Sequence, residues 1–229
     1  MDLVKLTDRI CYLPHHAELD RPMLAYVKGD RFALAIDAGY SKDHIDLFHS
    51  ALTQAGLALP DFTVITHWHY DHTFGLHAAK GISIAHRKTN AALRELRRMA
   101  ENEALFAMLK EKDPCYAKEY ADAPDPEISL THIEYDEEAT INLGGVTAKL
   151  IHPVSPHSED STCVYIPEER ILFLGDCTSE DFFNDGYMDL DKLHALVSTI
   201  RSVECETCVL SHCEPLSKNE LVAYLEQLG

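Results

Sequence analysis

Six consecutive residues, His67-Trp-His-Tyr-Asp-His72, place three histidines and one aspartate directly after the apolar segment 61–66. That segment is short and rich in β-branched and aromatic residues, so it predicts a buried strand that ends at the cluster. Residues two apart in extended chain share a side, so His67, His69 and Asp71 converge while His72 takes an adjacent position. Imidazole and carboxylate together suit zinc or a similar first-row metal. The segment therefore predicts a metal site at the end of a strand.

Three more candidate ligands lie far along the chain, each at or near a predicted strand. His157 lies in a polar loop before a strand. Asp176 follows the apolar run 171–174 through a glycine, and His212 follows the run 207–210. Loops at the ends of rigid strands are where sheets display functional groups. We therefore expect these three side chains to join the cluster at 67–72.

The remaining pattern predicts strands followed by helices, twice over. A Lys28-Gly29-Asp30 turn between two apolar runs predicts a β-hairpin. Prolines among charged residues predict a loop or broken helical insertion over 111–127. Further strands are predicted at 23–27, 31–36, 82–85, 139–143, 146–151 and 161–166, and helices at 42–55, 90–110, 189–201 and 217–228.

The composition predicts a globular protein and excludes a mainly disordered one. The chain has 229 residues, of which 46% are hydrophobic, enough to bury the core of one large domain or two small ones. No window approaches the roughly 20 apolar residues of a membrane helix, and the N-terminus lacks the layout of a signal peptide. Seven cysteines, an odd number, fit free thiols in a reducing compartment. We therefore expect a cytoplasmic protein that does not associate with membranes.

The charge is strongly negative but unevenly distributed. A net charge of -18 argues against a nucleic acid as partner, because affinity for phosphates comes from clustered Lys and Arg. Residues 80–100 nevertheless carry a net +5. This basic patch is either the solvated face of a strand-helix unit, or a lid that attracts an anionic substrate or packs on a partner subunit in a homo-oligomer. Its basic residues are Lys80, Arg87, Lys88, Arg94, Arg97 and Arg98.

The ordered motifs resemble the metallo-β-lactamase superfamily. They comprise a His-x-His-x-Asp-His motif, a later His, an Asp in a Leu-Gly-Asp context and a C-terminal His, and the resemblance runs from about Leu24 to Leu228. It implies an α/β fold, an αββα sandwich of two mixed β-sheets with helices outside and metals at one edge. One domain would span 1–229, with the insertion at 88–127 as a lid. Asp37, at a strand end, would support the metal site.

The resemblance also implies a set of ligands. His67, His69 and His157 would bind one metal, and Asp71, His72 and His212 the second. Asp176 would bridge the two ions together with a water or hydroxide. The ions would be zinc, with iron or manganese as alternatives, and Asp71 would also be catalytic, orienting the hydroxide and moving its proton. In this chain Pro156 precedes His157, and Ser211 and Cys213 flank His212, side chains that reshape the pocket wall without removing a ligand.

The function implied is that of a dinuclear metal-dependent hydrolase. A metal-bridging hydroxide would attack a small ester, thioester, lactone or related substrate. The alternative is an oxidoreductase that resembles persulfide dioxygenases, which hold one iron with a subset of the same ligands. A phosphodiesterase or nuclease, a β-lactamase and a binding protein without turnover are each less favoured. The β-lactamase subclass with a cysteine ligand has it where Asp176 stands.

Several other polar residues are predicted to have no role in the site. His15 and His16 are expected in a solvated loop before the first hairpin, with a position at the rim of the pocket as the alternative. Tyr40, Tyr70 and Tyr187 are expected to pack or lie on the surface rather than donate to a substrate oxygen.

Overall fold

Two β-sheets pack face to face in a computed structural model that describes residues 2–101 and 104–228. Among these residues one sheet has seven strands in the order β1-β2-β3-β4-β5-β6-β7, and the other has six in the order β13-β12-β11-β10-β9-β8. The strands of the first sheet are β1 (Val4–Lys5), β2 (Ile10–Leu13), β3 (Leu24–Lys28), β4 (Ala33–Ile36), β5 (Phe62–Val64), β6 (Ile82–His86) and β7 (Ile133–Tyr135). Those of the second are β8 (Glu138–Asn142), β9 (Thr147–Ile151), β10 (Cys163–Ile166), β11 (Ile171–Gly175), β12 (Thr207–Leu210) and β13 (Leu216–Ser217).

Both sheets are mixed, as predicted. In the first sheet β1 to β4 are antiparallel, while β4 to β7 pair in parallel. In the second, β11 and β12 are parallel and the other pairs are antiparallel. Parallel strands end at the same edge of a sheet, so the residues that follow β4 and β5, or β11 and β12, emerge side by side.

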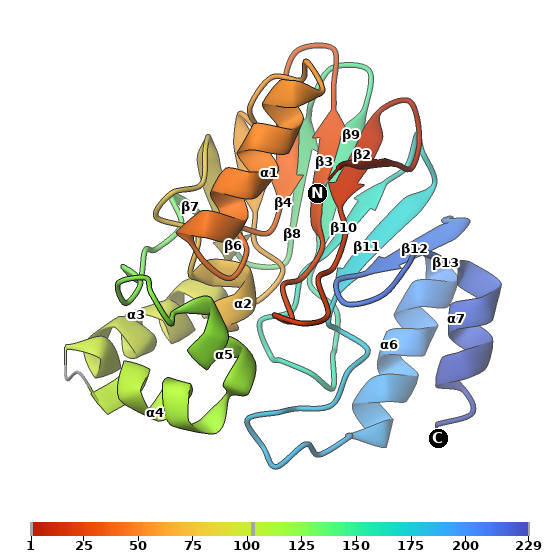
Figure 1. Ribbon diagram of the computed structural model, residues 1–229. Helices are drawn as coiled ribbons and strands as arrows, with labels where there is room; N and C mark the ends of the chain where they lie inside the picture. Colours follow the sequence, from red (N-terminus) through yellow and green to blue (C-terminus); the bar gives the residue numbers. More distant parts are fainter. Residues whose placement is uncertain (1, 102–103, 229) are drawn as a thin grey trace.

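Helices cover the outer faces of both sheets (Figure 1). They are α1 (Lys42–Gln54), α2 (Tyr70–Thr73), α3 (Arg87–Ala100), α4 (Ala104–Lys112), α5 (Pro114–Glu119), α6 (Leu190–Ser202) and α7 (Lys218–Leu225). Helix α1 and the α3–α5 segment pack on the first sheet, and α6 and α7 pack on the second. The αββα sandwich with helices outside is therefore confirmed.

The central strands are apolar along their whole length because both of their faces are covered. On β4, Leu34 and Ile36 point into the core between the sheets, whereas Ala33 and Ala35 contact α1. Strand β11 alternates in the same way, with Ile171 and Phe173 inside and Leu172 and Leu174 against α6. These continuous apolar runs are why the sequence identifies the central strands clearly.

The predicted helix over 90–110 is wrong in its extent. Helix α3 starts earlier, at Arg87, because the Nδ1 of His86 accepts the backbone N–H of Lys88 at its first turn. Helix α4 is a separate element, and residues 102 and 103 between the two lie outside the described residues. Both helices pack their apolar sides into one cluster over the first sheet. The sequence also failed to identify the short elements β1, β2, β7, β13 and α2.

The segment predicted as a broken helical insertion contains α5, which is held to the body by a buried ion pair. Asp113 caps α5 through its side chain, and Pro114 begins the helix. At the other end, Glu119 accepts both Nε and Nη2 of Arg21 at 2.8 Å. Glu119 also accepts the hydroxyl of Ser41, the residue that caps α1. The side chain of Glu119 is fully buried, and its carboxylate joins α5 to Arg21 and to the start of α1.

The basic patch at 80–100 is largely paired with acidic side chains. Arg87 pairs with Asp136, Lys88 with Glu159, and Arg94 with Glu134. Arg98 pairs with a glutamate of its own helix, and Arg97 donates to a backbone carbonyl. This arrangement favours the interpretation of the patch as the surface of a strand-helix unit.

Over the described residues, we find no helix with the length and apolar character needed to cross a membrane.

We expect Glu119→Gln to lower the free energy of unfolding by about 3 kcal/mol, because it leaves the Arg21 guanidinium partly buried without its counter-charge. Thermal denaturation should show a drop in Tm of about 6–12 °C. Glu226→Gln, which breaks the exposed pair with Arg201, is the matched control and should cost less than about 1 kcal/mol. Equal losses in the two variants would contradict the anchoring role of Glu119.

Candidate metal centre

Asp37, directly after β4, is the buried carboxylate on which the site is built. It is 1% exposed and has a left-handed backbone with φ of 66°. Its Oδ1 accepts the backbone N–H of Thr66 at 2.7 Å, and its Oδ2 accepts the Thr66 hydroxyl at 2.9 Å. The same Oδ2 accepts Nδ1 of His72 at 2.8 Å. Asp37 therefore ties the end of β4 to the chain after β5 and to α2, as the resemblance implied.

His67 and His157 are oriented through their Nδ1 atoms. Because the Thr66 hydroxyl donates to Asp37, it can accept from Nδ1 of His67, which lies 3.1 Å away. Nδ1 of His157 lies 2.8 Å from the carbonyl oxygen of Glu180, which can only accept. With Nδ1 donating, a neutral ring carries its lone pair at Nε2, the form that binds metals. The Nε2 atoms of His67 and His157 face each other at 3.1 Å.

Asp176 is presented by a backbone turn that requires glycine. Gly175 ends β11 with φ of 56°, and a Cβ on it would lie 2.8 Å from Cβ of Thr66. A side chain here would therefore clash with the segment that holds Asp37 and His67. The turn brings Oδ2 of Asp176 to 3.4 Å from Nε2 of His72 and 3.8 Å from Nε2 of His157.

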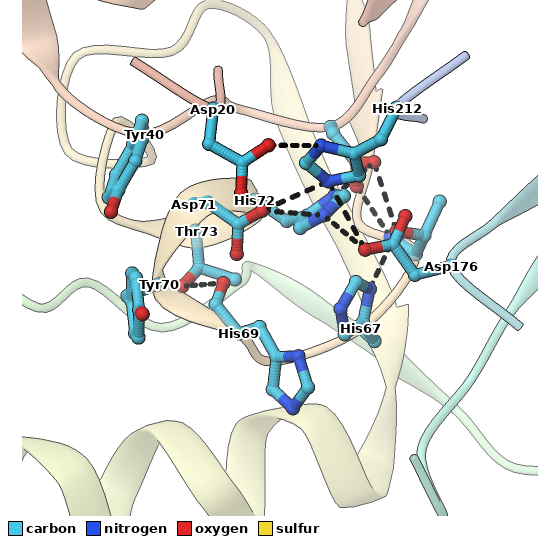
Figure 2. A network of polar contacts seen from close by, with 12 residues as sticks. Asp20, Tyr40, His67, His69, Tyr70, Asp71, His72, Thr73, Asp176 and His212 are labelled. Carbon is cyan, nitrogen blue, oxygen red and sulfur yellow. Dashed lines mark hydrogen bonds and ion pairs between the residues drawn. The ribbon is translucent and has the colours of Figure 1, made fainter. Parts of the chain in front are cut away.

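The last histidine is held by the N-terminal part of the chain. Backbone N–H of Met23 donates to the carbonyl of Ser211 at 2.7 Å, which fixes the loop after β12. Nδ1 of His212 lies 3.1 Å from Oδ1 of Asp20, so Nε2 points inward. It lies 3.3 Å from Oδ2 of Asp71 and 3.2 Å from Oδ2 of Asp176. Figure 2 shows Asp20 on the outer side of His212 and the two other carboxylates on its inner side.

All seven residues predicted as ligands lie together in two adjoining groups. Each group has one ligand atom from every member within 4.8 Å of the others. Asp176 connects the groups, since its Oδ2 approaches histidines of both. The groups are His67, His69 and His157, and Asp71, His72, Asp176 and His212. This division matches the one that the resemblance implied, with Asp176 between the two sets.

Burial and the neighbouring charges set the protonation of the site. Burial lowers the pKa of His69 to about 3, and neighbouring imidazoles contribute to the decrease. Burial opposes ionisation of Asp71 and Asp176, but His72 and His212 hold the pKa of both carboxyls well below the usual range. Burial likewise opposes protonation of His212, yet Asp176, Asp20 and Asp71 raise its pKa to about 12. The carboxylates thus attract positive charge, whether it arrives as protons or as a metal cation.

The residues present fit a metal by the chemistry of their donor atoms. Nε2 of His72 is fully buried and has no hydrogen-bond partner among the described residues, although Oδ2 of Asp71 lies 3.1 Å away. The facing Nε2 atoms of His67 and His157 repel each other as lone pairs unless a cation lies between them. A buried, partnerless nitrogen and facing lone pairs are both satisfied by divalent cations.

Asp20 and His15 belong to this site, and the expectation that the His15-His16 loop is merely solvated is corrected for His15. Nε2 of His15 lies 3.2 Å from Oδ1 of Asp20, and its ring packs edge-on against that of His212, with centroids 5.0 Å apart. His15, Asp20 and His212 form a third group with metal-ligand chemistry. Asp20 also has a left-handed φ of 50°, a strained conformation for a residue other than glycine. Only the adjacent histidines hinted at this loop in the sequence.

Two of the tyrosines have their hydroxyls engaged away from the ligands. Tyr40 and Tyr70 both donate to Oδ2 of Asp113, at 3.0 and 2.6 Å. Their rings pack against each other and against Tyr116. Tyr187 is 59% exposed. The prediction that these three residues pack or lie on the surface is consistent with these positions.

Comparisons with known proteins agree with this arrangement. A family model described as the metallo-beta-lactamase superfamily matches residues 24–212. A solved metallo-beta-lactamase from Pontibacter korlensis is 19% identical, covers 99% of this chain and 98% of its own, and has a TM-score of 0.69. The sec-alkylsulfatase Pisa1 from Pseudomonas sp. is 12% identical with a TM-score of 0.74, and the match covers 98% of this chain but 40% of that one.

A third solved structure, the DIM-1 metallo-beta-lactamase, is 16% identical over 100% of this chain and 99% of its own, with a TM-score of 0.68. At these identities the structures are similar to this chain in fold alone. No curated protein matches the sequence.

We expect Asp20→Ala to weaken metal binding about 10–100-fold, because the outer nitrogen of His212 loses the carboxylate that orients it. Competition with a chromogenic chelator would measure the affinity, and circular dichroism would verify the fold. Asp30→Ala is the matched control, since Asp30 is similarly exposed and pairs with Arg9. Unchanged affinity in Asp20→Ala would show that His212 needs no outer partner.

Proposed function

This chain belongs to the metallo-beta-lactamase superfamily, and from that premise we propose that it is a metal-dependent hydrolase with two divalent cations in one site. Members of this superfamily are mostly metal-dependent hydrolases. The proposed substrates are small esters, thioesters, lactones or related molecules. We propose zinc as the metal, with iron or manganese as alternatives.

The observation that carries this proposal is the sharing of one carboxylate between two groups of ligands. His67, His69 and His157 would hold one cation. Asp71, His72 and His212 would hold the second, and Asp176 would serve both, because its Oδ2 lies between them. A closed structural zinc needs only four ligands, so seven residues around a partly open site favour a catalytic centre.

The cations would acidify water and stabilise the negative charge that develops on a substrate oxygen. The side chains supply orientation and proton transfer. Asp71 is suited to the proton, because its side chain is 16% exposed and Oδ2 lies within 3.3 Å of both His72 and His212. It would accept a proton from the attacking water and return it to the leaving group.

Access to the site favours a small substrate that enters beside His212. The side chain of His212 is 27% exposed and that of Asp71 is 16% exposed, whereas His67, His72 and His157 are almost completely buried. A reacting carbonyl group can therefore approach from the side of His212 and Asp71. The deeper histidines would exclude bulk water behind it.

We expect purified protein to hold about two divalent ions per chain and to hydrolyse members of a panel of thioesters, lactones, esters, phosphodiesters and β-lactams. Mass spectrometry of the metals and product assays would measure both. Asp176→Ala should lose at least one ion and lower kcat/KM by at least about 100-fold. Asp191→Ala, which removes an exposed carboxylate at the start of α6, should change neither.

Metal identity and oxygen dependence separate the hydrolase from its alternative. Two zinc ions with turnover under anaerobic conditions would support hydrolysis. One iron per chain, with oxygen consumed as a persulfide is oxidised, would overturn the proposal in favour of a dioxygenase. A phosphodiester or β-lactam as the best substrate would keep the hydrolytic mechanism and change the substrate class.

A further inference from the structure

The connection between β11 and α6 exposes three aromatic side chains. Phe182, Phe183 and Tyr187 are 61%, 56% and 59% exposed. The connection is nevertheless a built turn rather than a loose loop. Asp181 N–H donates to the carbonyl of Tyr187 at 3.0 Å, and Tyr187 N–H donates to that of Asn184 at 3.0 Å. The backbone that carries the three rings is therefore fixed by hydrogen bonds.

Two of these rings lie directly against the candidate ligands. The Phe183 ring centroid is 4.7 Å from that of His69 and 4.7 Å from that of Trp68. The Phe182 ring is edge-on to His157 at 5.7 Å. The carbonyl of Glu180, at the start of the same turn, accepts Nδ1 of His157. Trp68, Phe182 and Phe183, which we call the aromatic platform, are thus continuous with the metal-ligand groups.

Exposed apolar surface that adjoins a reactive site indicates a binding surface rather than chance exposure. The polar groups of the site lie elsewhere, around Asp20, Asp71 and His212. At the site, ion pairs between described residues join only histidine and aspartate. Arg87, Lys88 and Arg94 of the 80–100 patch form ion pairs with carboxylates outside the site. The surface that adjoins the candidate ligands on this side is therefore mainly apolar.

We propose that the aromatic platform binds the apolar acyl chain of the substrate while its carbonyl group lies at the metals. This inference rests on the proposed hydrolase function and narrows its substrate class. The preferred substrates are esters or thioesters of acyl groups several carbons long, not acetyl esters and not acyl groups that carry a terminal carboxylate. The aromatic rings would cover one side of such a chain and leave the other in solvent, so each methylene would be about half buried.

The kinetic test uses thioesters of one thiol with acyl groups from acetyl to octanoyl. Full burial of a methylene would raise kcat/KM about fourfold, so half burial predicts about twofold per methylene. Phe183→Ala should flatten this dependence, and Phe183→Leu should restore part of it. Tyr224→Ala is the matched control, because Tyr224 is 57% exposed on α7 and lies outside the platform. It should keep the wild-type dependence.

The binding test does not depend on turnover. Trp68 is the single tryptophan of the chain, so its fluorescence reports on the platform alone. We expect 2-octanone, which a hydrolase does not cleave, to quench Trp68 at a concentration at least about tenfold lower than 2-butanone does, for four additional methylenes. In Phe183→Ala the two ketones should bind alike.

The outcomes distinguish this inference from the function on which it rests. Hydrolysis with no dependence on acyl length would overturn the inference and leave the proposed function intact. Discrimination between the ketones without hydrolysis of any substrate in the metal-loaded protein would retain the platform and overturn the function. Sedimentation tests two other occupants, a second copy of the chain and phosphatidylcholine–phosphatidylglycerol vesicles. In either case Phe182→Asp would abolish the dimer or the vesicle binding, while the dependence of kcat/KM on acyl length would persist. Either result would assign the platform to another occupant and overturn the inference.

Discussion

The structure of the site depends on one buried carboxylate, Asp37. Burying such a charge costs several kcal/mol unless it is fully hydrogen bonded, and here three donors from Thr66 and His72 compensate it. Because these donors come from two other segments, the buried charge of Asp37 is fully hydrogen bonded only when β4, β5 and α2 are all correctly placed. The left-handed backbone of Asp37 persists for the same reason, since the surrounding contacts overdetermine it. The hydrogen bonds of Asp37 therefore fix the positions of Thr66, which precedes His67, and of His72.

Around this centre, each well-defined ligand is oriented by a different kind of outer partner. His72 is held by a carboxylate, His67 by a hydroxyl, His157 by a backbone carbonyl and His212 by a half-exposed aspartate. Buried partners define a geometry more strictly than an exposed one, which solvent screens. His67 and His72 therefore have buried outer partners, whereas that of His212 is exposed. His212, with a side chain 27% exposed, is the most exposed of these four histidines.

The sequence predicted the central strands and the seven clustered residues because both are recorded locally. Apolar runs such as 171–174 identify a strand covered on both faces, and His or Asp directly after such runs is a local pattern. The contribution of Asp20 escaped prediction, because its partner His212 is 192 positions away and no spacing rule connects them. The break between α3 and α4 escaped for a related reason. Both helices show the same helical periodicity and pack into one cluster, so the pattern of apolar residues does not distinguish two helices from one.

The pairing of Asp20 with His212 has a consequence for the order in which the centre can assemble. The three-histidine group is contained within residues 67–157, so a chain growing from its N-terminus possesses it well before His212 is made. The contact of His212 with Asp20 spans 192 positions, so closing it carries a large loop-closure entropy. The ligands of the first proposed cation position are therefore all synthesised before residue 158, whereas the second proposed position is incomplete until His212 has been added.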